Sequence, residues 1–187
     1  MKARYLIALT LCLLPVLANA HPGHDGHSMF AGMAHPWLGM DHLIVMLAVG
    51  MWASQLGGRM RWALPLSFVS MMIVGAAMGL GGIQLGAVEQ SIAASVCVLG
   101  LFLSTAIRFP TVVCILLTSC FALFHGYAHA AEAGGNSALL YIGGFAVSTA
   151  LLHGLGLGIG RVLSQHQRVI RWIGAAIAIS GVAMLAM

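Results

Sequence analysis

Charge is the scarcest property of this sequence. Of 187 residues only 6% are charged, while 60% are hydrophobic and the mean hydropathy is +0.99. A soluble domain carries about 25% charged residues, so a globule exposed to water on all sides is excluded. The same scarcity of charge and excess of apolar residues exclude a disordered chain. An integral membrane protein is the class that remains, and the length allows one domain.

The first twenty residues have the pattern of a secretory signal peptide. Lys2 and Arg4 precede an apolar stretch, 6–18, which is followed by a small-x-small cleavage site at 18–20. The apolar stretch has about 13 residues, fewer than the ~20 that a spanning helix needs. The sequence therefore predicts cleavage after Ala20, with an uncleaved first span as the alternative.

Cleavage there predicts a histidine-rich periplasmic tail over residues 21–36. The tail holds His21, His24 and His27, and His21 would add an α-amine to its imidazole. We expect these groups to collect metal ions outside the membrane. A solvated leader with no role in metal binding is the alternative, and the sequence leaves both open.

Residues 37–187 read as an all-α transmembrane domain of six helices. The apolar runs are continuous instead of alternating, which excludes a β-barrel, and each is near the ~20 residues required to cross a bilayer. Glycine pairs and a Phe-Pro step separate them. The predicted spans are 37–56, 62–82, 86–107, 110–131, 138–160 and 169–187.

Basic residues predict the orientation of these spans. Beyond the signal peptide they all lie in alternate loops, at Arg59, Arg61, Arg108, Arg161, Arg168 and Arg171. The positive-inside rule places those loops in the cytoplasm of a bacterial inner membrane, with both mature termini in the periplasm. Carboxylates and seven of the nine histidines then lie on or near the outer face, where they would concentrate cations. No basic patch with interleaved aromatics is present, so lipid is an expected partner and nucleic acid is not.

The first group of candidate ligands begins just before the first predicted span. Pro36 suits the first turn of a helix and would hold His35 extended outside it. Asp41 and His42 would fall within the first two turns of the span. Ionisable residues inside a membrane cost a few kcal/mol or more and are functional candidates by default. The alternative is that Asp41 caps the helix while His42 lies among the lipid headgroups.

The second group lies near the outer end of the fourth span. His125, His129 and Glu132 are spaced by four and three residues, so at about 100° per residue they share one helical face. Two imidazoles at i and i+4 often bind one divalent ion, and a helix C-terminus favours a cation. Imidazole with some carboxylate suits Ni²⁺, Co²⁺, Zn²⁺ or Cu²⁺ better than Ca²⁺ or Mg²⁺. The sequence alone does not choose among the four.

Two further ionisable residues have weaker signals. His153, deep in the fifth span, is either an inner relay for an ion or a core histidine bonded to a backbone carbonyl. Glu89, at the start of the third span, either joins the outer site or pairs with a helix end.

Glycine spacing suggests how the spans pack. The second span contains Gly75-x-x-x-Gly79 and the fifth Gly154-x-x-x-Gly158, the spacing that lets membrane helices approach closely. These spans occupy equivalent places in two halves of opposite orientation, so the pattern predicts an inverted 3+3 repeat.

The two groups of ligands resemble the signature motifs of the HupE/UreJ family of bacterial membrane proteins. His35, Pro36, Gly39, Asp41 and His42 match its HPxxGxDH element. Phe124, His125, Gly126, Ala128, His129 and Glu132 match its FHGxAHGxE element, with Ala130 in place of a glycine. The resemblance covers essentially the whole mature chain. It implies a nickel permease that supplies hydrogenase or urease, working by facilitated diffusion, with cobalt carried by some members.

The sequence therefore predicts a metal-ion permease and no enzyme. Its expected ligands are His35, Asp41, His42, His125, His129 and Glu132, the ion is cargo, and no permanent cofactor is expected. An intramembrane zinc hydrolase with Asp41 or Glu132 as general base is one alternative. A periplasm-facing metal sensor or metallochaperone is another, and a homo-oligomer is compatible with either.

Overall fold

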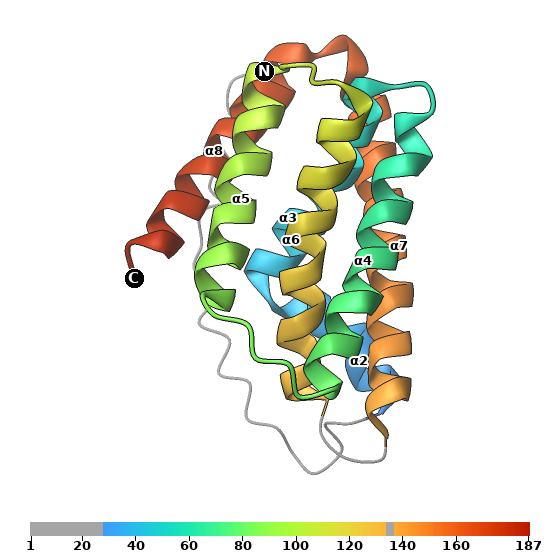
Figure 1. Ribbon diagram of the computed structural model, residues 1–187. Coiled ribbons are helices and arrows are strands. Elements are labelled where there is room, and N and C mark those ends of the chain that lie inside the picture. Colours follow the sequence, from blue (N-terminus) through green and yellow to red (C-terminus); the bar gives the residue numbers. More distant parts are fainter. Residues whose placement is uncertain (1–27, 134–136) are drawn as a thin grey trace.

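The computed structural model describes residues 28–133 and 137–187, except for the side chains of residues 131 and 132. The predicted signal peptide and His21, His24 and His27 lie outside the described residues. The described chain is helical and contains no strand (Figure 1). Its elements are α2 (Met29–Leu38), α3 (Met40–Leu56), α4 (Met60–Leu80), α5 (Val88–Thr105), α6 (Thr111–Glu132), α7 (Ala138–Val162), a 3₁₀ turn (Leu163–Gln165) and α8 (Gln167–Leu185).

The helices have the length and surface of membrane spans. Five of them, α4 to α8, are long and apolar enough to cross a bilayer, and the bent pair α2–α3 would make a sixth crossing. Large apolar side chains are exposed along them, among them Leu66, Leu116, Leu139, Val162 and Trp172. In water such a surface would be unfavourable, whereas lipid chains match it. The chain is a multi-pass membrane protein.

Five of the six predicted spans agree with the structure, and the first does not. Helices α4 to α8 differ from the predicted ranges by no more than two residues at either end. The first predicted span, in contrast, is two helices that meet at an angle of 83°. Helix α2 begins at Met29, so 29–36 is helical instead of an extended tail, and Pro36 lies in the last turns of α2 instead of the first turn of a span.

Local chemistry explains both ends of α2. The Ser28 side chain accepts a hydrogen bond from the Ala31 backbone N–H at 3.1 Å, which caps the helix at its start. Pro36 cannot donate a backbone hydrogen bond, and Gly39 has extended backbone angles, so the helix ends there. The Gly39 N–H bonds to the His35 carbonyl, and the Gly39 carbonyl accepts from Leu43 in α3, which keeps the bend compact.

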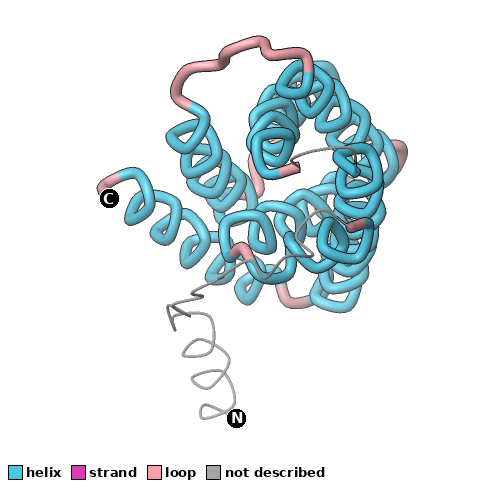
Figure 2. Tube along the Cα trace, turned by 90° about the horizontal axis from the view of Figure 1, so that it is seen from below, coloured by secondary structure: helices cyan, strands magenta, loops and turns pink. Residues whose placement is uncertain are grey.

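Helix α3 is the centre of the bundle. It contacts α2, α4, α5, α7 and α8, and its residues from Val45 through Ala53 are almost all buried. Because it is apolar on every side, α3 resembles a core helix more than a surface helix. Seen end-on, the helices stand side by side in one bundle (Figure 2).

Glycine contacts define three closely packed helix pairs. A Cβ built on Gly126 of α6 would collide with the Met72 backbone of α4, and one on Gly156 of α7 with the Leu47 backbone of α3. One on Gly100 of α5 would meet the Ala178 backbone of α8 in the same way. Small residues at these positions let the helix backbones approach within contact distance.

The glycine prediction is confirmed for the second span and wrong for the fifth. Gly75 meets the Leu123 backbone and is a packing residue as expected. Gly154 and Gly158 have nothing within 4 Å, because they lie on the opposite side of α7 from α3. The residues that pack are Gly156, against Leu47, and Gly160, against Ser54.

The three close pairs, α4 with α6, α3 with α7 and α5 with α8, join spans two and four, one and five, and three and six. Exchanging the first three spans with the last three turns the pairs α4–α6 and α3–α7 into each other and leaves the pair α5–α8 unchanged. The pairing is compatible with the inverted repeat, which itself stays a prediction.

Candidate metal site

Four histidine rings from three helices lie together inside the bundle. His42 of α3 is central, with its ring centroid 4.4 Å from that of His129 and 4.9 Å from that of His125, both on α6. The ring of His35, on α2, lies 4.8 Å from His129 and 5.8 Å from His42. We call these four residues the histidine cluster. Two motifs more than eighty residues apart in the sequence therefore meet in space.

The bend at Gly39 brings the two histidines of the first motif to the cluster. His35 occupies the last turn of α2, and His42 the first turn of α3, so both rings lie beside the bend. On α6 the i, i+4 spacing puts His125 and His129 on one face, as predicted. The Trp37 indole N–H donates to the Ser148 hydroxyl of α7 at 2.7 Å and fixes α2 against that helix.

The cluster is withdrawn from solvent and lipid. His42 is 6% exposed, His129 1% and His125 0%, whereas His35 is half-buried. Aromatic rings form part of its wall: Phe145 of α7 stacks 3.7 Å from His129, and Phe68 of α4 lies 5.7 Å from His125. Burying this many imidazoles is costly unless their nitrogens have partners.

Asp41 fixes the ring of His42. Its carboxylate lies 2.7 Å from His42 Nδ1 and 2.8 Å from the His42 backbone N–H. A carboxylate only accepts hydrogen bonds, so Nδ1 carries the proton and Nε2 keeps its lone pair. Nε2 is buried and has no hydrogen-bond partner. A histidine held through one nitrogen by a carboxylate, with the other free, is the arrangement of many metal ligands.

Ser95 of α5 has the same relation to His125. Its hydroxyl donates to the Ile92 carbonyl at 2.6 Å and lies 3.0 Å from His125 Nε2. A hydroxyl has one proton to donate, so His125 Nε2–H is the donor in the second contact and Nδ1 keeps its lone pair. His125 Nδ1 is also buried without a partner. Two adjacent rings therefore each present an unpaired lone pair, a donor set that suits a borderline transition metal such as Ni²⁺ or Co²⁺.

The rings as they stand are in edge-to-face contact. Among the described side chains, no group of three or more histidines, cysteines, aspartates or glutamates is placed to hold a metal ion. Glu132 is the last residue of α6, and its side chain lies outside the described part of the chain. Coordination by three ligands therefore requires the rings to turn.

Comparison with known proteins shows the family of this chain. The family model described as HupE / UreJ protein matches residues 9–184. The chain belongs to the HupE/UreJ family. A similar curated protein, Protein HupE of Rhizobium leguminosarum bv. viciae, is 41% identical over 180 residues, which cover 95% of this chain and 94% of that protein. No solved structure matches the chain significantly.

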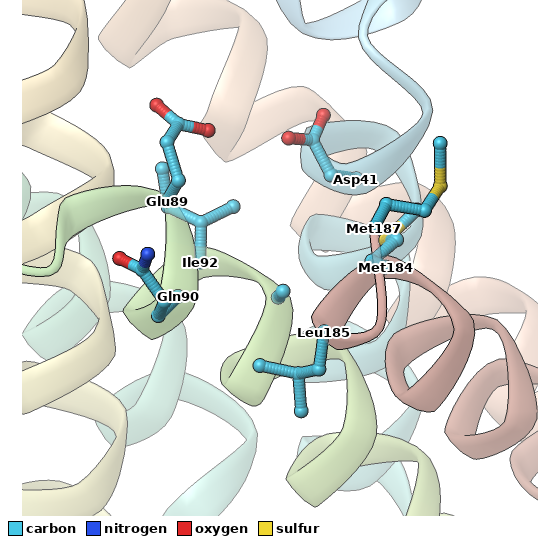
Figure 3. Close-up of a pocket in the computed structure, with 8 residues that line it drawn as sticks. Asp41, Glu89, Gln90, Ile92, Met184, Leu185 and Met187 are labelled. Atoms are coloured by element: carbon cyan, nitrogen blue, oxygen red, sulfur yellow. The ribbon is translucent and has the colours of Figure 1, made fainter.

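A cavity beside the cluster holds the two described carboxylates. It measures about 310 Å³ and opens between α3, α5 and the end of α8. Asp41 and Glu89 extend toward the same part of it, with Met184 and Met187 alongside (Figure 3). Glu89 also lies in the first turn of α5, so both alternatives for it, a role in the outer site and an interaction with a helix end, stay open.

Charge is divided between the two ends of this HupE/UreJ bundle. The turns α3–α4 and α7–α8 and the loop α5–α6 lie together at the top of Figure 1, and the six arginines of the described chain are in or beside them. Asp41 lies in the first turn of α3 and Glu89 in the first turn of α5, so both carboxylates lie toward the opposite end. This separation is compatible with the orientation predicted from the positive-inside rule.

His153 lies apart from the cluster on α7. It is 1% exposed, and neither of its ring nitrogens has a hydrogen-bond partner, so the alternative of a core histidine bonded to a backbone carbonyl does not hold in this structure. Its ring meets Phe68 edge-to-face at 5.0 Å. Sequence reasoning did not find Ser95, Phe68 or Phe145, because a single serine or phenylalanine in an apolar run has no spacing signal.

Proposed function

We propose that this protein is an inner-membrane permease for a divalent transition-metal ion, Ni²⁺ foremost and Co²⁺ second, that supplies the maturation of cytoplasmic metalloenzymes. The observation that carries the proposal is the meeting of four imidazoles from α2, α3 and α6 inside an apolar helical bundle. Membership in the HupE/UreJ family supports it.

The histidine cluster has the chemistry needed to take an ion out of water. A bare dication is prohibitively costly in a membrane, so its hydration shell must be replaced by ligands before it enters. His42 Nε2 and His125 Nδ1 supply two lone pairs already freed from other hydrogen bonds. His35, His129 and Glu132 complete the proposed ligand set, and Asp41 orients His42 while adding negative charge.

The cavity next to the cluster is the proposed entrance. Asp41 and Glu89 would raise the local concentration of cations there. The tail with His21, His24 and His27 would collect ions farther out. We infer that both mature termini are periplasmic and that the signal peptide is cleaved after Ala20.

Vesicle flux with purified protein tests the proposal directly. The wild-type protein is reconstituted into liposomes that contain a nickel-sensitive dye, and Ni²⁺ is added outside. We expect saturable Ni²⁺ entry that falls at least tenfold in His42→Ala and in His129→Ala, because each removes a ring from the cluster. His166→Ala is the control, since His166 is an exposed residue between the 3₁₀ turn and α8.

Three outcomes separate the permease from its alternatives. Wild-type flux in both cluster variants would contradict the assigned site. Binding of Ni²⁺ without flux in the wild type would favour a sensor or metallochaperone. Tightly retained stoichiometric zinc in the purified protein would favour a hydrolase.

A further inference from the structure

His153 and nearby side chains with hydroxyl and thioether groups lie deeper in the bundle than the histidine cluster. Helix α7 starts at Ala138, and His153 lies about 22 Å along it, whereas His125 lies about 10 Å from the end of α6 at the same side of the molecule. A dication that leaves the cluster must find ligands at that depth, because hydrocarbon offers none.

Thr149 stands one turn before His153 on the same face of α7. A helical side chain covers the turn on the N-terminal side of its own Cα, so the His153 ring covers the level of Thr149. The Thr149 hydroxyl is fully buried and lies 3.4 Å from the Met46 sulfur of α3 and 3.7 Å from the Met72 sulfur of α4. One imidazole, one hydroxyl and two thioethers thus come from three helices.

Phe68 separates this group from the histidine cluster. Its ring lies 5.7 Å from that of His125 and 5.0 Å from that of His153, and its side chain is fully buried. On α4, Phe68 is one turn before Met72, and on α3, Met46 is one turn after His42. The cluster and the inner group are therefore one helical turn apart on α3, and the Phe68 ring lies between His125 and His153.

His153 itself is the second, independent sign of a ligand. It is 1% exposed, and both of its ring nitrogens lack a hydrogen-bond partner. Buried polar atoms in native proteins nearly always have partners, so an imidazole left unpaired on both sides indicates an absent one. Close backbone contact at this level, where a Cβ on Gly50 would strike the His153 carbonyl, leaves the ring few ways to reach water.

We propose that His153, Thr149, Met46 and Met72 form an inner station that a transition-metal ion occupies after it passes Phe68. The proposal rests on the permease function above. All four donors are neutral, in contrast to the outer cluster with its Asp41 carboxylate, so the inner station binds the ion more weakly. Conduction requires this, because an ion must be able to leave each site. Imidazole and thioether also exclude Ca²⁺ and Mg²⁺, which require oxygen ligands.

Metal binding and flux in matched variants test the inner station. The full-length protein in detergent is titrated with Co²⁺ and followed by its visible absorption, and the same preparations are reconstituted for Ni²⁺ flux. We expect His153→Leu to bind one Co²⁺ fewer than the wild type, with the tightest affinity unchanged within twofold, and to lose at least tenfold in flux. His153→Gln, which keeps an oxygen donor, is expected to recover part of the flux, and His166→Ala to behave as wild type.

The possible results test the existence of the inner station separately from the permease function. An unchanged number of bound Co²⁺ in His153→Leu, or flux within twofold of wild type, would overturn the inner station and leave the permease intact. Loss of the tightest-bound Co²⁺ as well would assign His153 a structural role and also overturn it. Absence of Ni²⁺ flux in the wild type would contradict the permease, while the Co²⁺ stoichiometry would still report on the inner donors.

Substitutions that preserve shape provide a second test if His153→Leu does not fold. Thr149→Val and Met46→Leu remove one donor each at nearly constant volume. We expect both to lower Ni²⁺ flux several-fold with the tighter Co²⁺ affinity unchanged. Wild-type flux in both would overturn the station.

Discussion

At the scale of single residues, hydrogen bonds to two neighbouring side chains decide which ring nitrogens of the cluster keep a lone pair. Asp41 holds His42 through Nδ1, and Ser95 holds His125 through Nε2. In each case the opposite ring nitrogen is left buried and unpaired. Which nitrogen of a histidine faces an ion is thus decided by the hydrogen bond on its other side.

The substitution Asp41→Asn tests this orienting role. The variant keeps the size of the side chain but loses its charge, and an amide at this position no longer restricts His42 to one tautomer. We expect Ni²⁺ affinity to fall roughly 10- to 100-fold, as is usual when a metal-ligating histidine loses its outer partner. Isothermal titration in detergent measures it, and an affinity equal to that of the wild type would contradict the orienting role.

Ser95→Ala is the companion variant for His125, with a smaller expected loss of Ni²⁺ affinity because a neutral partner is removed. Its matched control is Ser91→Ala, one turn earlier on α5, where the hydroxyl bonds only to the Ala87 carbonyl among the contacts described. Equal affinities in Ser95→Ala and Ser91→Ala would show that Ser95 does not orient the ring.

At the scale of helices, backbone contact at glycine holds the cluster together. Gly126 lies next to His125 and against the Met72 backbone, so the position of the His125 ring depends on the close approach of α6 to α4. The positions of the His35 and His42 rings depend in the same way on the bend at Gly39. Gly126 lets two helix backbones approach, whereas a Cβ on Gly39 would lie 3.1 Å from Asp41 Oδ1 and 3.2 Å from His42 Nδ1, so glycine there leaves room for this pair.

Gly126→Ala and Gly154→Ala are expected to have opposite effects on stability. The first adds a methyl group where the Met72 backbone already lies, which should destabilise the fold by about 1–3 kcal/mol and lower Ni²⁺ binding. The second adds a methyl group to a helix interior with nothing within 4 Å, which should stabilise the fold by about 0.5–1 kcal/mol. Thermal unfolding in detergent compares them, and a stable Gly126→Ala protein would refute the close contact.

At the scale of the whole molecule, the bundle is electrically asymmetric. The described arginines gather at one end, and Asp41 and Glu89 lie toward the other, next to the cavity. In a membrane this distribution favours one orientation during insertion, and the acidic end would attract cations.

Alkaline phosphatase fusions test the predicted orientation, because this enzyme is active only after export to the periplasm. We expect an active fusion after Met187 and an inactive one after Gln165, which lies in the arginine-bearing connection before α8. Activity is normalised to the amount of fusion protein in the membrane. The reverse pattern would show that the protein has the opposite orientation in the membrane, with the histidine cluster near the cytoplasmic face.

The sequence by itself determined the class of the protein, five helices to within two residues, and both histidine motifs. Runs of about 20 apolar residues and an i, i+4 pair of histidines are local properties, and a bilayer admits few alternatives to a helix. The sequence did not predict the break at Gly39, because the apolar composition continues across it. Pro36 suggested the start of a helix, but the helix starts earlier because Ser28 caps it and because α2 packs against α7.

Only the tertiary structure decided which helices pair and which side chains meet. Nothing in the sequence showed that Gly156 and Gly160 would pack while Gly154 and Gly158 would not, because both pairs have the same spacing and the facing helix selects between them. Ser95, Phe68 and Thr149 likewise acquired neighbours from distant segments. Contacts of this kind depend on the relative rotation of whole helices, which no local pattern of residues encodes.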